Sequence, residues 1–349
     1  MATSRRWRGI GAFLALFALL AGGAAYWAWD RWQDFQHEPL AGVDAGDGYV
    51  VERGDSFARV LQKIREAGVR EGSDLEWQLL ARQLGAAGRL QVGEYALEPG
   101  MSARDVLANM RDGRVVRHRF TIVEGWNIRE LRAALARAEH LQSDSAALDD
   151  AALMAAIDRP GVHPEGRFLP ETYLYTRGDS DLDVLRRANR ALERALDEAW
   201  AQRADNLPLK TAEEALVLAS IVEKETGIAE ERPQIAGVFV RRLQIGMRLQ
   251  TDPTVIYGIG ADFDGNIRRR DLQTDTPYNT YTRDGLPPTP IAMPGVAALR
   301  ATTQPADGDA LYFVAIGDGS GRHVFSRTYA EHNVAVREYV RRYRARVAQ

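Results

Sequence analysis

The sequence predicts an α+β protein made of a transmembrane helix, a small subdomain and a larger domain. Residues 9–29 carry no charge over a length that can cross a bilayer. Strand-like runs at 49–51 and 90–97 enclose two segments of helical period. Further on, helical segments are separated by turn-rich stretches, and the runs at 311–316 and 323–326 form a predicted hairpin. Short strands among many helices are typical of an α+β fold.

The composition excludes several kinds of protein. The chain has 349 residues, enough for two or three domains. Its net charge of −3 argues against a nucleic-acid partner, which would require a strongly basic surface. The absence of cysteine excludes disulfides, thiol catalysis and thiolate metal sites. The histidines are scattered without metal-ligand spacing, and no P-loop or dinucleotide-binding glycine pattern is present, so we expect no metal and no cofactor.

The N-terminal apolar run has the flanks of a membrane anchor. Arginines precede it and aromatic residues suited to the bilayer interface follow it: Arg5, Arg6, Arg8, Tyr26, Trp27, Trp29 and Trp32. The positive-inside rule makes 1–8 a cytoplasmic tail and 9–29 a single transmembrane helix, with the rest of the chain outside. A cleaved signal peptide is the alternative, because residues 21–25 are small. The continuation into aromatic residues favours a retained anchor.

Behind the anchor, the chain divides into three further parts. Residues 30–48 are polar and interrupted by Pro39 and two glycines, which indicates a linker. A subdomain is predicted at 49–117 and a larger domain at 118–349. Within the subdomain, the pattern around Ser56 returns around Ser102, as two capped helices or a weak repeat would produce.

The most informative element is a predicted helix that begins after Thr211, a good N-cap, and ends at Gly227, a predicted C-cap. It is apolar on nearly all sides, which predicts a buried core helix. Two glutamates stand at its end. Glu225 shares a face with the large residues Leu218, Ile221 and Val222, whereas Glu223 lies nearer to smaller side chains.

Desolvation by such a face raises the pKa of a carboxyl group and keeps it protonated, as a general acid requires. The alternative is a solvated helix end on which Glu223 and Glu225 are ordinary surface charge.

Two polar, aromatic-rich loops offer partners for a sugar. Gln250, Thr251 and Asn279 supply hydrogen-bonding groups, and tyrosine faces stack on sugar rings. Asp252 is either a second carboxylate, as hydrolysis of a glycoside normally needs, or a turn or N-cap residue. The loop at 164–175, rich in proline and aromatic residues, lines a site or forms a packed lid.

The runs at 218–226, 232–258 and 277–295 strongly resemble the bacterial endolytic murein transglycosylase family, the YceG-like or MltG proteins. The resemblance extends over essentially the whole chain. The opening of the subdomain at 49–56 is similar to a LysM module, a strand–helix–helix–strand unit that binds glycans containing N-acetylglucosamine. The alternative for this subdomain is a spacer without a sugar groove.

The resemblance implies a single-pass inner-membrane protein, with a LysM-like subdomain at 49–117 and a periplasmic YceG-like catalytic domain at 118–349 that is distantly lysozyme-like. Members cut nascent peptidoglycan strands internally between N-acetylmuramic acid and N-acetylglucosamine. Their product ends in 1,6-anhydro-N-acetylmuramic acid, and the cut terminates glycan elongation. Implied partners are peptidoglycan strands, the inner membrane and penicillin-binding proteins or other synthases. The alternative function is a non-catalytic glycan-binding scaffold for cell-wall synthesis.

The same resemblance implies the site residues. The family's catalytic glutamate falls on Glu225, with Glu223 as the second candidate. One carboxyl is sufficient, because the muramyl 6-hydroxyl rather than water is the nucleophile. The predicted substrate-binding residues are Gln250, Thr251, Asp252, Asn279, Tyr281, Glu165, Phe168 and Glu171.

Overall fold

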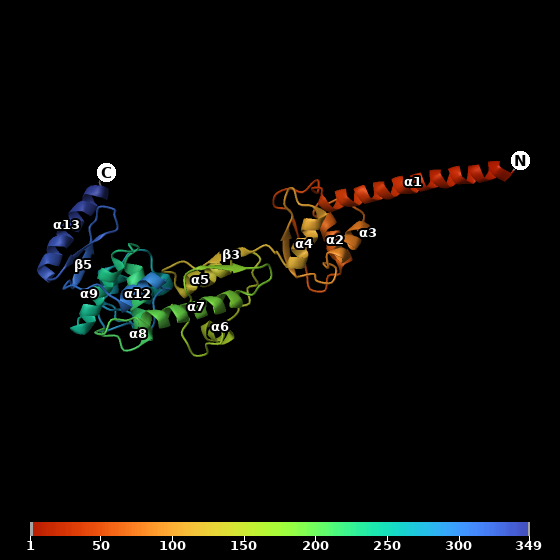
Figure 1. Cartoon of the computed structure of the whole chain (residues 1–349). Helices are drawn as coiled ribbons and strands as arrows, with labels where there is room; N and C mark the ends of the chain where they lie inside the picture. The colour runs from red at the N-terminus through yellow and green to blue at the C-terminus, as the bar shows by residue number, and fades with distance from the viewer. Residues whose placement is uncertain (1–2, 348–349) are drawn as a thin grey trace. The chain divides into compact units, whose positions relative to one another are not determined.

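In the computed structural model, the described residues form helices and three two-stranded sheets arranged in two compact units (Figure 1). The structure describes the backbone of residues 3–347, so the first two residues of the predicted cytoplasmic tail lie outside it. The first unit contains residues up to 118 together with 176–178, and the second contains 119–175 and 179 onward. The predicted α+β class is confirmed.

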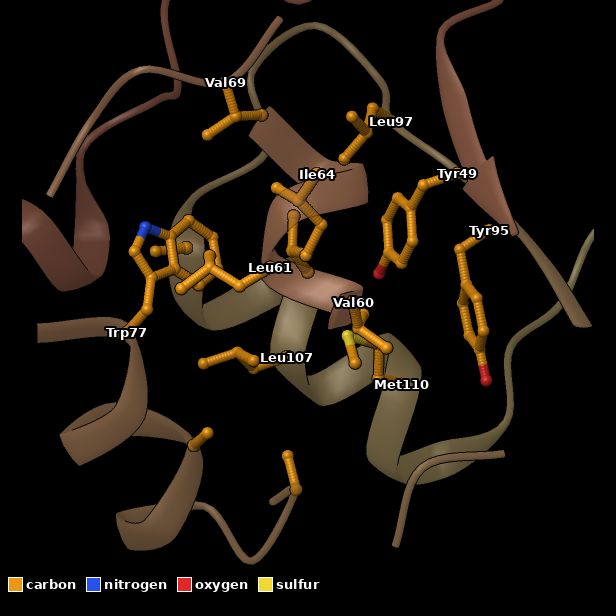
Figure 2. Packing of buried hydrophobic residues seen from close by; sticks show 14 of the residues in the cluster. Tyr49, Val60, Leu61, Ile64, Val69, Trp77, Tyr95, Leu97, Leu107 and Met110 are labelled. Atoms are coloured by element: carbon orange, nitrogen blue, oxygen red, sulfur yellow. The ribbon is translucent and has the colours of Figure 1, made fainter. Parts of the chain in front are cut away.

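The first unit has the predicted order of strand, two helices and strand, followed by a further helix. Its elements are α1 (Thr3–His37), β1 (Gly48–Val51), α2 (Phe57–Glu66), α3 (Asp74–Gln83), β2 (Gly93–Ala96) and α4 (Ala103–Asp112). Ser56 and Ser102 cap α2 and α4, so their related surroundings in the sequence reflect two capped helices. Figure 2 shows the core, where Trp77 and Leu107 pack around α2.

The first part of the predicted linker at 30–48 is helical. The helix α1 continues to His37, and its stretch Ala12–His37 is long and apolar enough to cross a membrane. Trp32 and Phe35 pack against the core of the first unit, where Phe35 meets Trp77 edge-on with 5.6 Å between ring centroids. These aromatic residues lie three apart on one helical face, so the helix continues because it has a packing surface.

The second unit is built around α8. Its elements are β3 (His118–Thr121), α5 (Ile128–Leu135), α6 (Asp150–Ala156), β4 (Thr172–Tyr175), α7 (Asp181–Ala201), α8 (Ala212–Glu225), α9 (Arg232–Gln244), α10 (Asp252–Ile259), η1 (Gly260–Asp262), α11 (Arg269–Gln273), α12 (Val296–Thr303), β5 (Tyr312–Ala315), β6 (His323–Ser326) and α13 (Tyr329–Val347). Helices α7, α9 and α12 pack around α8.

The sequence predicted the course of α8 well. Thr211 is its N-cap and accepts a hydrogen bond from Glu214 N, and every residue of 215–223 is buried. The predicted C-cap at Gly227 is wrong, because the helix ends at Glu225 and Thr226 is already extended, with φ −149° and ψ 136°. Glu225 is therefore the last helical residue.

Candidate active site

A pocket of about 300 Å³ in the second unit lies at the C-terminal end of α8. Five of the predicted site residues line it: Glu225, Gln250, Thr251, Asp252 and Tyr281. Its other walls come from α9, β5 and the first turn of α13: Arg242, Tyr312, Phe313, Tyr329 and His332. A larger hollow of about 720 Å³ beside β6 and α13 is lined mainly by aliphatic and arginine side chains and contains none of the predicted site residues.

Glu225 is half-buried, and its carboxyl group is held in a defined position. The Thr251 hydroxyl donates a hydrogen bond to its Oε1. Burial raises the pKa of Glu225 from its usual 4.5 to about 7, and the nearby Asp252 carboxylate acts in the same direction. The Thr251 hydrogen bond and the Arg242 cation oppose this rise. Protonated and ionised forms of Glu225 are therefore both populated near neutral pH.

Hydrogen bonds accepted by Thr280 join the two polar loops that were predicted to carry the site. Thr280 Oγ1 accepts from Thr251 N at 3.1 Å, and Thr280 O accepts from Gln250 N at 3.2 Å. Thr254 Oγ1 donates to Thr251 O at 2.8 Å. Gln250 has a φ of 50°, a left-handed conformation that is unfavourable for a residue with a side chain and is often found at functional sites.

Asp252 is the first residue of α10, where the sequence led us to expect a loop. A carboxylate at a helix N-terminus is favoured by the helix dipole. Its Oδ1 accepts a hydrogen bond from the Tyr281 hydroxyl at 2.6 Å, and burial together with this bond raises the pKa of Tyr281. Asp252 and Tyr281 thus line the pocket as a hydrogen-bonded pair.

Glu223 occupies a different environment from Glu225. Its Oε2 accepts from Gly295 N at 2.9 Å, and its Oε1 lies 3.4 Å from the Arg232 guanidinium. Arg232 also lies 3.5 Å from Glu124. Burial raises the pKa of Glu223 as well, but its carboxyl group joins α8 to α9 and to the segment before α12 rather than lining the pocket.

Four predicted substrate-binding residues lie outside the pocket lining. Asn279 is buried and its Nδ2 donates to the carbonyls of Asp271, Leu272 and Thr274, so the amide fixes its own loop. Phe168 is fully buried in a hydrophobic core, whereas Glu171 is exposed beside β4.

Glu165 is fully buried and acts as an acceptor inside the second unit. Its carboxyl group accepts from Ile128 N at 3.1 Å and from the Tyr257 hydroxyl at 3.0 Å. Burial raises the pKa of Glu165 to about 7. These hydrogen bonds join α5 to α10, so the Glu165 carboxyl group holds two helices together.

The sequence reasoning missed five polar or aromatic residues of the pocket, namely Arg242, Tyr312, Phe313, Tyr329 and His332. Arg242 is buried, and its guanidinium donates to the carbonyls of Leu311 at 2.7 Å and Leu249 at 2.5 Å. The His332 ring stacks on Tyr312 with 5.3 Å between centroids. Burial and the Arg242 cation lower the pKa of His332, which keeps the imidazole neutral. The only sequence signal for this wall was the density of aromatic residues around 312–332.

The fold and the pocket define an α+β protein with a partly desolvated carboxyl group facing polar and aromatic side chains. The chain belongs to the YceG-like family, whose model matches residues 49–338. An endolytic murein transglycosylase of Bacillus subtilis is 30% identical over 307 residues, which cover 83% of this chain and 84% of that protein. A protein of the same name from Streptococcus pneumoniae R6 is 26% identical, covering 94% of this chain and 64% of that protein.

A solved structure supports the fold. The 2.6 Å crystal structure of a yceG-like protein from Listeria monocytogenes aligns with a TM-score of 0.51 and 25% sequence identity. The alignment covers 82% of this chain and 97% of the Listeria chain.

Proposed function

We propose that this protein is a membrane-anchored endolytic lytic transglycosylase that cuts nascent peptidoglycan between N-acetylmuramic acid and N-acetylglucosamine. Family membership and the names of the relatives support the activity. The observation that carries the site is Glu225, a half-buried carboxyl group with a pKa raised to about 7 in a pocket of hydroxyl, amide and aromatic groups. Such surroundings suit a sugar polymer and an acid catalyst.

In the proposed mechanism, Glu225 acts twice. Protonated Glu225 gives its proton to the glycosidic oxygen, and the bond from that oxygen to the muramyl anomeric carbon breaks. The resulting carboxylate takes the proton of the muramyl 6-hydroxyl, whose oxygen bonds to the anomeric carbon and closes the 1,6-anhydro ring. Glu225 is protonated again, and no water is consumed. Intramolecular attack benefits from proximity.

The Thr251 hydroxyl is assigned a positioning role. Because it donates to Glu225 Oε1, it fixes the orientation of the carboxyl group. Gln250, Asp252 and Tyr281 then remain as the groups of the predicted set that face the substrate. Asp252 is held by Tyr281 and is not required as a nucleophile in this mechanism.

We further propose that α1 spans the inner membrane with the N-terminus in the cytoplasm and both compact units in the periplasm. Its length, its apolar composition and the arginines before it support this topology. The order β1–α2–α3–β2 of the first unit supports a LysM-like role in holding glycan.

Product analysis tests the proposal. The full-length protein in detergent is incubated with uncrosslinked glycan strands, and the products are analysed by mass spectrometry. We expect internal cleavage with anhydro ends. Reducing muramic acid ends would instead show a hydrolase, and binding without cleavage would favour the scaffold function.

A further inference from the structure

The C-terminal end of α1 is docked firmly on the first unit. Beyond the contact between Phe35 and Trp77, Gln36 Oε1 accepts from Arg104 at 3.2 Å and Leu40 N donates to Met101 O at 2.8 Å. The helix thus passes from the apolar stretch into the core of the unit without a flexible segment between them.

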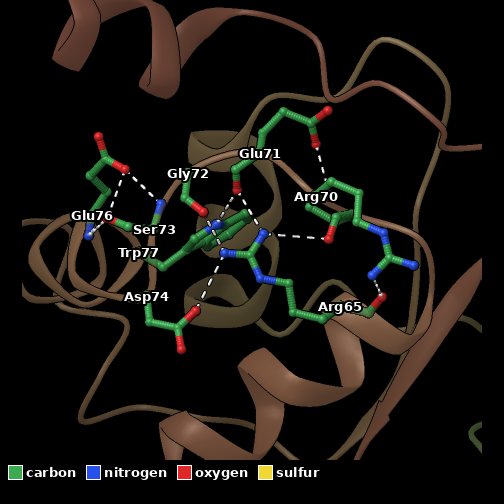
Figure 3. A network of polar contacts seen from close by, with 9 residues as sticks. Arg65, Arg70, Glu71, Gly72, Ser73, Asp74, Glu76 and Trp77 are labelled. Atoms are coloured by element: carbon green, nitrogen blue, oxygen red, sulfur yellow. Dashed lines mark hydrogen bonds and ion pairs between the residues drawn. The ribbon is translucent and has the colours of Figure 1, made fainter.

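Hydrogen bonds fix the loop before α3 (Figure 3). Trp77 Nε1 donates to Glu71 O at 2.9 Å, and the Arg65 guanidinium donates to Glu71 O at 2.8 Å and to Gly72 O at 2.5 Å. Ser73 and Glu76 form a capping box at the start of α3. The position of α3 relative to α1 is therefore determined inside this unit.

The start of α3 contacts α1 at Arg31, directly after the aromatic residues that end the apolar stretch. The Arg31 guanidinium lies over the Trp27 ring, 5.8 Å from its centroid, and Arg31 Nε donates to Glu76 Oε1 at 3.3 Å. Trp27 and Arg31 are about 6 Å apart along the helix axis, at 1.5 Å per residue. The headgroup region on each side of a bilayer is about 5–8 Å thick. With Trp27 at the edge of the hydrocarbon core, Arg31 and the Glu76 carboxylate that it binds lie within that region, and Leu75 precedes Glu76 on α3.

The outer face of α3 carries two exposed leucines. Leu75 is 64% exposed and Leu79 is 46% exposed, and residues four apart share a helix face. The opposite face buries Trp77, Leu80 and Ala81 in the core of the unit. The charged residues around the leucines are of both signs, so the patch is apolar rather than strongly basic or acidic.

We propose that α3 is a membrane-docking element whose Leu75 and Leu79 insert into the outer headgroup region of the bilayer that α1 spans. The proposal rests on the membrane span of the proposed function, and the occupant is the phospholipid surface itself. The occupant is lipid rather than a protein partner because α3 is held on the membrane-spanning helix α1 and its residue Glu76 binds Arg31 just beyond the apolar stretch. Insertion is driven by apolar side chains, so it is insensitive to salt and to the fraction of anionic lipid. The first unit is consequently held in one orientation on the membrane.

Because the chain contains no cysteine, single cysteines can report the depth of chosen residues. The variants are Leu75→Cys and Leu79→Cys on the docking face, Leu19→Cys within the span, and Ala58→Cys on α2 as an exposed control in the same unit. Each full-length protein is labelled with a polarity-sensitive fluorophore and placed in nanodiscs of zwitterionic or mixed anionic lipid. Quenching by nitroxide-bearing lipids is then measured.

We expect quenching at Leu75 and Leu79 several-fold stronger than at Ala58 and similar in both lipid mixtures. Water-like signals at both leucines together with a lipid signal at Leu19 would overturn the docking proposal and leave the span intact. A water-like signal at Leu19 would instead overturn the span on which the proposal rests. Docking that requires anionic lipid would contradict the apolar mechanism.

Discussion

The change Glu225→Gln tests the proposed catalytic residue with the smallest possible alteration in shape. The glutamine carbonyl oxygen can still accept the Thr251 hydroxyl, so the pocket and the fold should be preserved. The amide cannot supply or take a proton, and general acid–base catalysis contributes about 10²–10⁴-fold in rate. Since the proposed mechanism assigns both proton transfers to Glu225, we expect kcat to fall by about 10³-fold or more, which corresponds to about 4 kcal/mol of activation free energy.

The assay compares anhydro ends released per unit time with the thermal midpoint of unfolding of the same preparation. Glu223→Gln is the matched control, because it changes a second buried glutamate on the same helix. It weakens the contact with the buried Arg232 guanidinium, and we expect a loss of about 1–3 kcal/mol in stability with kcat within a few-fold of wild type. Full activity in Glu225→Gln, or inactivity confined to a stably folded Glu223→Gln, would refute the assignment.

Three further predictions follow from the titrating groups and their partners. Activity should decline as pH rises above about 7, because the protonated form of Glu225 is lost through its raised pKa; a rate that increases from pH 7 to 9 would contradict the acid role. Thr251→Val removes the hydroxyl that orients the Glu225 carboxyl group and lowers its pKa. We therefore expect kcat to fall about 10-fold with KM unchanged, and the alkaline limb of the pH profile to move to higher pH. Because burial raises the pKa of Glu165 in the folded protein to about 7, the folded state holds this proton more tightly than the unfolded state does. Protonation of Glu165 therefore stabilises the fold below pH 4.5, and this contribution, about 3 kcal/mol, should be lost as pH rises to about 7. Urea unfolding at several pH values checks the last point, since Glu165→Gln should show a smaller loss than wild type over that range.

The sequence was most informative where local patterns determine structure. The continuous apolar composition of α8 and its threonine cap predicted a buried helix with its N-terminus at the right residue. The polar loops around Thr251 and Tyr281 were predicted to carry the site, and both residues line the pocket. Asn279 illustrates the limit of such reasoning, because a loop amide can serve the substrate or its own backbone, and only the fold shows that it donates to three carbonyls.

The sequence was least informative where a residue depends on a distant partner. Phe35 was assigned to a linker because its packing partner Trp77 lies on a different helix. No sequence pattern distinguished Arg242, because its guanidinium is held by carbonyls that precede α10 and β5. His332 reaches the pocket only because the last helix packs on β5. No local period encodes these contacts.

The position of Glu225 suits the proposed mechanism, in which one carboxyl group acts first as an acid and then as a base. Burial, the neighbouring Asp252 carboxylate and the negative end of the α8 dipole all favour the protonated form. If these effects acted alone, the acid step would be easy, but the group would hold its proton too strongly to release it and then act as a base. The buried cation of Arg242 and the hydroxyl of Thr251 oppose them and bring the pKa to about 7. Arg242, which no sequence pattern indicated, therefore contributes to the site by lowering the pKa of Glu225.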